Sequence, residues 1–252
     1  GIRDRSPSRG LGDVDKRQGF TDCHSHLLPG VDDGIQTIDE ALQILHFYEK
    51  KGVKKVWLTP HIMEDLPNST EHLRSCFDKL QKAYTGPVIL RLSAENMLDN
   101  LFEERLASGD LLPFGEKKNA LLVETSYMHP PVGFRETLLR IKSKGYYPIL
   151  AHPERYVYMD FSDYQALKQL GVLFQLNLFS LNGVYGKAAK EKALLLLKNG
   201  LYDLAGSDVH GSAFLQRNIT RKSFHKSVLK ELDRLESVSY THLRAHETDS
   251  YL

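Results

Sequence analysis

Cysteine and long hydrophobic runs are both scarce in this sequence. Its 252 residues include two cysteines, Cys23 and Cys76, which form neither a Cys-x-x-Cys pair nor a disulfide framework. The longest purely apolar run, residues 193–197, is far shorter than the ~20 residues that a membrane-spanning helix needs. These absences argue against a thiolate metal site and a membrane span, and they indicate a reducing, cytoplasmic setting.

An excess of charge of one sign is absent as well. Residues 19–237 contain 27 Lys or Arg and 27 Asp or Glu side chains, so the formal charge of this part is zero. A protein that binds nucleic acid through its phosphates needs a basic surface. The charge balance therefore argues against a nucleic-acid partner.

Both ends of the chain look foreign to the rest of it. Residues 8–18, SRGLGDVDKRQ, resemble one reading frame of a sequencing adapter, and residues 238–248, VSYTHLRAHET, resemble the reverse complement of that adapter. We therefore expect residues 1–18 and 238–252 to be adapter-derived tails, and residues 19–237 to form a single domain. On this interpretation His242 and His246 are not ligand candidates.

Short apolar runs alternate with helical patterns along residues 19–237. The helix predicted first opens with a capping box, Thr37 with Glu40, and ends before Gly52. This alternation indicates an α/β fold with parallel strands, and seven units favour a distorted (β/α)7-type barrel. The predicted strands are 20–23, 53–59, 88–94, 120–124, 147–151, 172–177 and 201–205. The predicted helices are 37–51, 70–84, 98–107, 134–144, 161–170, 187–199 and 223–235.

Histidines and carboxylates gather just after the predicted strands. In a β/α barrel the carboxyl ends of the strands converge on one face, so these side chains are expected to line one pocket. Clustered carboxylates repel one another unless cations neutralise them, and this number of ligands implies more than one divalent metal ion. The candidates are the histidines His24, His26, His61, His152 and His210 and the carboxylates Glu95, Glu124 and Asp208, together with Asp32 and Asp33 in the loop VDDG.

The chemistry of these ligands does not determine the identity of the metal. Mixed imidazole and carboxylate ligation suits Mn, Fe or Zn. We expect two or three divalent ions and take Mn as the first choice, with Fe, Zn or Mg as alternatives.

The segments CHSHLLPGVDDG, TPH, SAE, VET, AHPERY and SDVH resemble, in order and spacing, the signature segments of PHP (polymerase and histidinol phosphatase) superfamily phosphatases. Within that superfamily, HSHLLPGVDDG and HPERY are most similar to the bacterial tyrosine phosphatases encoded with capsule and exopolysaccharide genes. The resemblance implies a single-domain PHP barrel in which nine of the candidates bind metal, namely His24, His26, Asp33, His61, Glu95, Glu124, His152, Asp208 and His210. It also implies that Arg155 contacts the phosphate of the substrate.

The resemblance implies a reaction and a partner as well. The reaction is hydrolysis of a phosphate monoester by metal-activated water, with the planar fork of Arg155 holding the phosphoryl group. The expected substrate is a phosphotyrosyl protein, such as a bacterial tyrosine kinase of polysaccharide export.

Several other functions remain as alternatives. A cysteine-dependent tyrosine phosphatase would need Cys, five residues and then Arg, but Pro29 and Lys82 occupy the two possible positions. A histidinol-phosphate or other small-molecule phosphatase would share the metal site and differ in the pocket for the leaving group. A non-catalytic metal-binding regulatory module is the second alternative, against which the completeness of the ligand set argues.

Two carboxylates near these ligands are interpreted differently. Asp32 is interpreted as an ordinary turn former before Gly34. Asp22 is a candidate for orienting a ligand imidazole from behind. Histidines on predicted helices, such as His46 and His72, are interpreted as surface or packing residues.

Overall fold

A ring of parallel strands forms the centre of this computed structural model, which describes residues 20–219, 228, 230–232 and 234–235. The two predicted tails, residues 1–18 and 238–252, lie outside the described residues. One sheet has the strand order β1-β2-β4 and the other β3-β5-β6-β7-β8-β9, and every pairing is parallel. The strands are β1 (Thr21–Ser25), β2 (Lys55–Leu58), β3 (His61–Ile62), β4 (Ile89–Leu92), β5 (Glu95–Met97), β6 (Ala120–Glu124), β7 (Tyr147–Ala151), β8 (Leu173–Asn177) and β9 (Leu204–Gly206).

The two sheets join into one barrel at both of their edges. On one side the amide of His26 donates to the oxygen of Val209, and the amide of Asp208 donates to the oxygen of His24, so β1 continues the order after β9. On the other side β2 leads into β3 and β4 leads into β5. The ring therefore has seven positions within the described residues, as the (β/α)7 prediction requires.

Two of the predicted strands are each followed by a second short strand that was not predicted, and Pro60 lies at the first of these breaks. The run 53–59 appears as β2, followed by β3 beyond Pro60, and the run 88–94 appears as β4, followed by β5. Pro60 has no N–H group to donate to a neighbouring strand. Its oxygen still accepts from Glu95 N, so the hydrogen bonding between the two neighbouring segments continues across the bend. The bend brings His61 and Glu95 to the starts of neighbouring strands.

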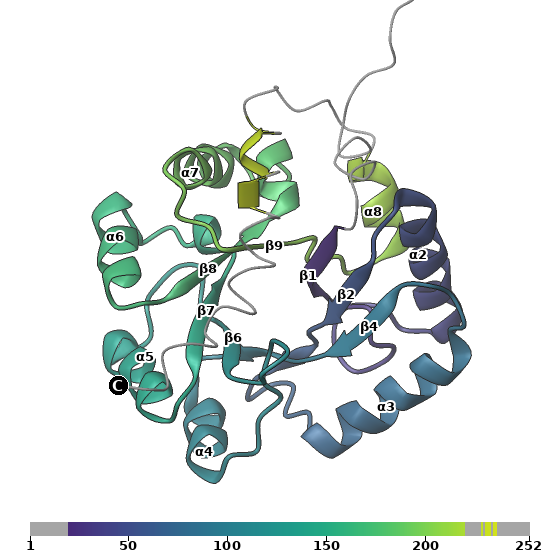
Figure 1. Ribbon diagram of the computed structural model, residues 1–252. Helices are drawn as coiled ribbons and strands as arrows, with labels where there is room; N and C mark the ends of the chain where they lie inside the picture. Colours follow the sequence, from purple (N-terminus) through teal and green to yellow (C-terminus); the bar gives the residue numbers. More distant parts are fainter. Residues whose placement is uncertain (1–19, 220–227, 229, 233, 236–252) are drawn as a thin grey trace, which may run out of the picture.

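Helices cover the outside of the ring (Figure 1). Thr37 caps the first of them by accepting from Glu40 N, and Gly52 ends it with a φ of 82°. The Glu40 side chain accepts from Ser212 instead of completing the predicted capping box. The helices are α2 (Ile38–Lys51), α3 (Thr70–Ala83), α4 (Asn100–Ser108), α5 (Phe134–Ser143), α6 (Phe161–Gln169), α7 (Lys187–Lys198) and α8 (Ser212–Ile219), with short 3-10 helices η1 (Pro153–Arg155) and η2 (Leu178–Asn182).

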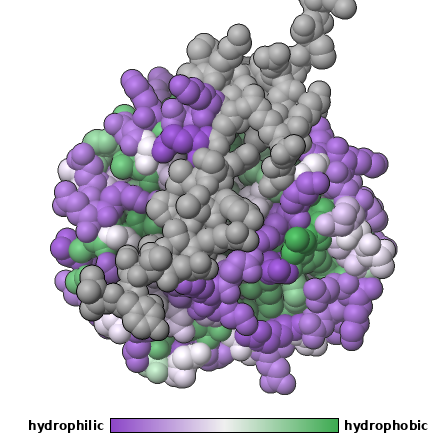
Figure 2. Space-filling model, in the orientation of Figure 1, coloured by the Kyte–Doolittle hydropathy of each residue, from purple (hydrophilic) through white to green (hydrophobic). Residues whose placement is uncertain are grey.

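Helix α8 was not predicted from the sequence. Much of the helix predicted at 223–235 lies outside the described residues, and those that are described within it are helical. No helix in the described ranges has the length and apolarity that crossing a bilayer requires. The face seen in Figure 2 is largely polar, with hydrophobic side chains showing in small separate areas.

A small hydrophobic cluster fills the barrel beneath its carboxyl-terminal face. It draws Cys23 from β1, Trp57 from β2, Leu122 from β6 and Ile149 from β7, and such a set can meet only inside the ring. The Trp57 and Phe114 rings lie 4.1 Å apart at its centre. Because strand side chains alternate, Leu122 and Glu124 share one face of β6. The cluster therefore forms a floor below Glu124, and the larger core packs the helices against the outside of the strands.

Candidate metal centre

The nine predicted ligands come together at the carboxyl-terminal face of the barrel. They line or surround a pocket of about 330 Å³. His24 and Glu124 lie in the last residues of β1 and β6, whereas His152 and Asp208 follow β7 and β9. The structure thus brings the nine together as predicted, although His61 and Glu95 begin the short strands β3 and β5. Whether the nine bind metal remains a prediction.

The most deeply buried group consists of His24, His26, Glu95 and Asp208. The Nε2 atoms of His24 and His26 lie 3.1 Å apart. The Oε2 atom of Glu95 is 3.0 Å from the first of them and 3.3 Å from the second, and Oδ1 of Asp208 is 3.4 and 3.3 Å away. Two nitrogens and two oxygens therefore face one point with no water-exposed side.

A second buried group contains His61, Glu95 and Glu124. Nδ1 of His61 lies 3.0 Å from Oε1 of Glu124 and 3.3 Å from Oε2 of Glu95, and Nε2 of His152 lies 2.9 Å from Oε1 of Glu95. Despite their proximity, His61 Nδ1 and Glu124 Oε1 form no hydrogen bond within the described part of the chain. Buried polar atoms without a hydrogen bond need another explanation, and a shared cation supplies one.

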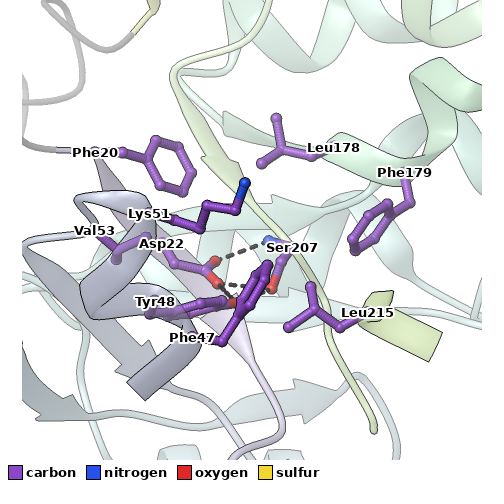
Figure 3. Close-up of a pocket in the computed structure, with 10 residues that line it drawn as sticks. All are labelled: Phe20, Asp22, Phe47, Tyr48, Lys51, Val53, Leu178, Phe179, Ser207 and Leu215. Carbon is purple, nitrogen blue, oxygen red and sulfur yellow. Dashed lines mark hydrogen bonds between the residues drawn. The ribbon is translucent and has the colours of Figure 1, made fainter. Parts of the chain in front are cut away.

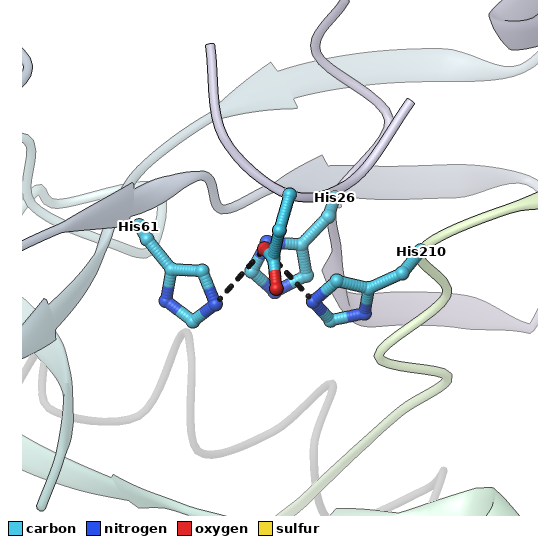
Figure 4. Close-up of side chains that lie close together, drawn as sticks. His26, His61 and His210 are labelled. Carbon is cyan, nitrogen blue, oxygen red and sulfur yellow. Dashed lines mark ion pairs between the residues drawn. The ribbon is translucent and has the colours of Figure 1, made fainter. Parts of the chain in front are cut away.

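The third group lies at the mouth of the pocket. His26, His61 and His210 point toward one another there (Figure 4). Oδ1 of Asp33 is 3.6 Å from Nε2 of His61 and 3.5 Å from Nε2 of His210, and the Asp33 side chain is 67% exposed. This outer group is therefore open to solvent and to a substrate.

The donor atoms fit divalent metal ions. In each group the ligand atoms lie within 4.8 Å of one another, and each group combines imidazole nitrogens with carboxylate oxygens. Residues shared between groups, such as Glu95 and His61, would place neighbouring ions close together, as in multinuclear hydrolases.

Two buried side chains orient the imidazoles from behind. Oε1 of Gln175 on β8 lies 2.9 Å from Nδ1 of His24, and Oδ2 of Asp32 lies 2.8 Å from Nδ1 of His26. Both oxygens accept hydrogen bonds, so each Nδ1 carries a proton, and each Nε2 atom faces the pocket and can bind a metal ion once it has lost its own proton. Asp32 forms the predicted turn by accepting from Gly34 N, but it also accepts from His61 N and His26 Nδ1.

The orienting role predicted for Asp22 was wrong. Its carboxylate accepts from the backbone amide of His24, the Ser207 side chain and Tyr48 OH, and among the described residues no imidazole forms a hydrogen bond with it. It lines a separate small pocket between β1 and α2 (Figure 3). Burial raises the pKa of this carboxyl despite these hydrogen bonds. Asp22 thus supports the backbone of β1 and not the ring of His24.

The backbone around the site adopts uncommon conformations. His152 and Asp208 have positive φ values of 33° and 53°, which non-glycine residues rarely adopt and which often mark functional sites. Gly206 lets β9 approach β1, since a Cβ atom there would lie 2.4 Å from Cβ of His24. Gly34 similarly makes room for His26.

Burial and charge act against each other on the ligand histidines. Burial disfavours the imidazolium of His24, but the nearby carboxylates of Glu95 and Asp208 outweigh it and raise the pKa of His24 to about 9. The pKa of His26 is also raised, well above its ordinary value, by Asp208, Asp32 and Glu95 against its burial. The His210 hydrogen bond lowers the pKa of Asp33 to about 2. Without metal, protons on the imidazoles balance the carboxylates.

We expect metal binding to release these protons. Because the metal-free His24 has a pKa of about 9, it is protonated at neutral pH and must lose its proton to bind a metal ion. Apparent affinity for Mn should therefore rise with pH, by up to about tenfold per unit for each proton released, and level off only above the pKa values of both His24 and His26. Calorimetric titrations in two buffers of different ionisation enthalpy count the protons, and zero release would contradict the expectation.

Arg155 lies beside the same pocket. It follows β7 in η1, and its Nη1 donates to Oδ2 of Asp208 over 2.9 Å. Three aromatic residues that sequence reasoning missed also line the pocket, namely Tyr127, Tyr185 and Phe214. Tyr127 follows the strand-end residue Glu124 by three positions, and this position could have indicated that it lies near the pocket.

Comparison with known proteins identifies the family of this chain. Residues 20–236 match the family described as capsular polysaccharide synthesis, CpsB/CapC. The chain belongs to this family. The resemblance drawn from the signature segments is therefore confirmed at the level of the family.

Individual relatives agree with this membership. The chain is 27% identical to the tyrosine-protein phosphatase YwqE of Bacillus subtilis over 210 residues, which cover 81% of this chain and 80% of YwqE. It is 25% identical to the tyrosine-protein phosphatase CpsB of Streptococcus pneumoniae over 211 residues, which cover 75% of this chain and 82% of CpsB.

The fold agrees with a solved relative too. A crystal structure from work on YwqE and CpsB, described as metal-dependent tyrosine phosphatases, superposes with a TM-score of 0.72 at 25% identity. The superposition covers 88% of this chain and 90% of the solved chain. The single-domain PHP-type barrel predicted from the sequence is confirmed.

Proposed function

We propose that this chain is a metal-dependent protein-tyrosine phosphatase that acts in the control of capsule or exopolysaccharide synthesis. The observation that carries the proposal is the convergence of nine imidazole and carboxylate ligands on one pocket, with Arg155 beside them. Membership of the CpsB/CapC family supports the biological role. The substrate is a phosphotyrosyl protein, and a tyrosine kinase of polysaccharide export in the cytoplasm fits the family.

Each part of the pocket has a separate task in this proposal. The ligands that hold two or three ions, with Mn as first choice, are His24, His26, Asp33, His61, Glu95, Glu124, His152, Asp208 and His210. Bound divalent ions in such sites supply activation of water and neutralisation of phosphoryl charge.

Arg155 binds the phosphoryl oxygens through its planar fork. Its link to Asp208 holds the guanidinium next to the deepest ligand group. A tyrosine phenolate, with a pKa near 10, leaves without a strong general acid.

The mouth of the pocket suits a protein substrate. Asp33 and His210 are the more exposed ligands, whereas His24 and Glu95 are fully buried, so the metal ligands extend from the surface into the barrel. A phosphotyrosine side chain projecting from a peptide reaches such an outer group without unfolding of either partner.

The decisive experiment removes the metal and restores it. We expect the full chain to release phosphate from a phosphotyrosyl peptide, to lose this activity after chelation and dialysis, and to regain it with Mn. Phosphate release that survives complete removal of metal would contradict the mechanism. Preferential turnover of histidinol phosphate would favour the small-molecule phosphatase, and metal binding without turnover of either substrate would favour the non-catalytic module.

A further inference from the structure

The guanidinium of Arg155 lies between two tyrosine rings. Its Cζ atom is 4.3 Å from the ring centroid of Tyr127 and 4.2 Å from that of Tyr185. These distances are well inside the ~6 Å range of cation–π contacts. The Arg155 side chain is 17% exposed, so most of the group is shielded from water.

Both rings are themselves held in place. The backbone oxygen of Tyr127 accepts from Val157 N over 2.9 Å, and its ring stacks on the buried Tyr156 at 6.0 Å with an interplanar angle of 26°. Tyr185 is partly buried and packs against the hydrophobic core.

Arg155 and Asn177 meet at one carboxylate oxygen. Nδ2 of Asn177 donates to Oδ2 of Asp208 over 2.8 Å, and Oδ2 also accepts from Arg155 Nη1. The stack is therefore anchored to the metal ligands on one side and to the buried Tyr156 on the other.

The contacts of Arg155 leave donors for a ligand. Within the part of the chain that the structure describes, Asp208 is the acceptor that Arg155 bonds to, through one of its three nitrogens. A free arginine side chain would rotate about several bonds and would lose that freedom on binding phosphate. A guanidinium clamped between two rings has lost it already, so its remaining N–H groups meet the phosphoryl oxygens at lower entropic cost.

We propose that Tyr127 and Tyr185 are positioning residues that hold Arg155 in a fixed plane for binding the phosphoryl group. The inference rests on the proposed function, since it assigns Arg155 to the substrate phosphate. It extends that function by making the efficiency of the arginine depend on two residues that contact no candidate ligand atom at hydrogen-bonding distance.

A double-mutant cycle tests the inference. Tyr127→Leu and Tyr185→Leu each remove a ring, whereas Tyr127→Phe keeps one, and each change is made in the wild type and in Arg155→Ala. We expect each leucine variant to weaken inhibition by inorganic phosphate and to raise KM for a phosphotyrosyl peptide roughly tenfold, the scale of a partly desolvated cation–π contact. Tyr127→Phe should stay within about twofold of the wild type.

The cycle is decisive because the inference requires both rings to act only through Arg155. In Arg155→Ala the leucine substitutions should have no further effect, and metal content should stay at the wild-type level throughout. Tyr146→Leu is the matched control, since Tyr146 precedes β7 at the opposite end of that strand from His152. Leucine effects that persist in full without Arg155, or that follow a loss of metal, would overturn the inference.

Failure of the proposed function would look different. A metal-loaded wild type that hydrolyses no phosphate ester would contradict the phosphatase assignment. Calorimetric binding of inorganic phosphate would still test the stack, because Tyr127→Leu must weaken that binding when Arg155 is present and leave it unchanged when Arg155 is absent.

Discussion

Arg155→Ala is expected to lower kcat for a phosphotyrosyl peptide by about a hundredfold to a thousandfold while the protein keeps its metal. This is the range seen when one preorganised donor to a developing charge is removed. Arg155→Lys should recover only part of the activity, because an ammonium keeps the charge but loses the two-pronged geometry.

The measurement pairs steady-state kinetics with metal analysis of the same samples. Arg135→Ala is a suitable control, because Arg135 is an exposed arginine on α5 that does not line the pocket. A variant that lost metal along with activity would indicate that Arg155 supports Asp208 and not the substrate. Unchanged kinetics would remove Arg155 from the reaction.

Glu95→Gln is expected to have an effect at least as large, by a different route. The two oxygens of Glu95 lie within 3.3 Å of ring nitrogens of His24, His26, His61 and His152, so this carboxylate joins the two buried ligand groups. The substitution preserves size but removes the charge and turns one acceptor into a donor. Even residues that only orient ligands change metal affinity or activity tenfold to a hundredfold, so we expect a loss of about a hundredfold or more.

Metal content should fall together with activity in this variant. Elemental analysis of purified Glu95→Gln against Glu104→Gln, an exposed glutamate on α4, separates a loss of ligand from a general effect of removing a carboxylate. A Glu95→Gln protein with full metal content and full turnover would show that Glu95 is not a ligand.

The barrel was predictable from local signals. The alternation of parallel strands with helices follows from the spacing of the apolar residues and from the residues that cap the helices. Thr37 and Gly52 mark the two ends of α2, as predicted. The short strands β3 and β5 were not predicted, because their pairing depends on Glu95 N meeting the oxygen of Pro60. Proline at position 60 marks a possible break in a strand, but sequence alone does not say which neighbouring strand bends with it.

The candidate ligands were predictable for a topological reason. Strand ends converge in a barrel, so a polar residue after each strand points to the pocket without knowledge of any distance. Gln175 was missed although it interrupts the apolar run VLFQLN, and a polar side chain in such a strand needs a buried partner. Tyr185 gave no comparable signal, since it lies in a loop beyond η2 and meets Arg155 only through the tertiary fold.

The closure of the barrel between β1 and β9 governs when the site can exist during folding. Residues 24–26 bond to residues 208–209, contacts that span almost the whole domain and therefore form slowly relative to local ones. A chain emerging from the ribosome presents His24 and His26 long before Asp208 and His210. Its deepest ligand group stays incomplete until β9 is in place, so we expect metal capture to be one of the last steps of maturation.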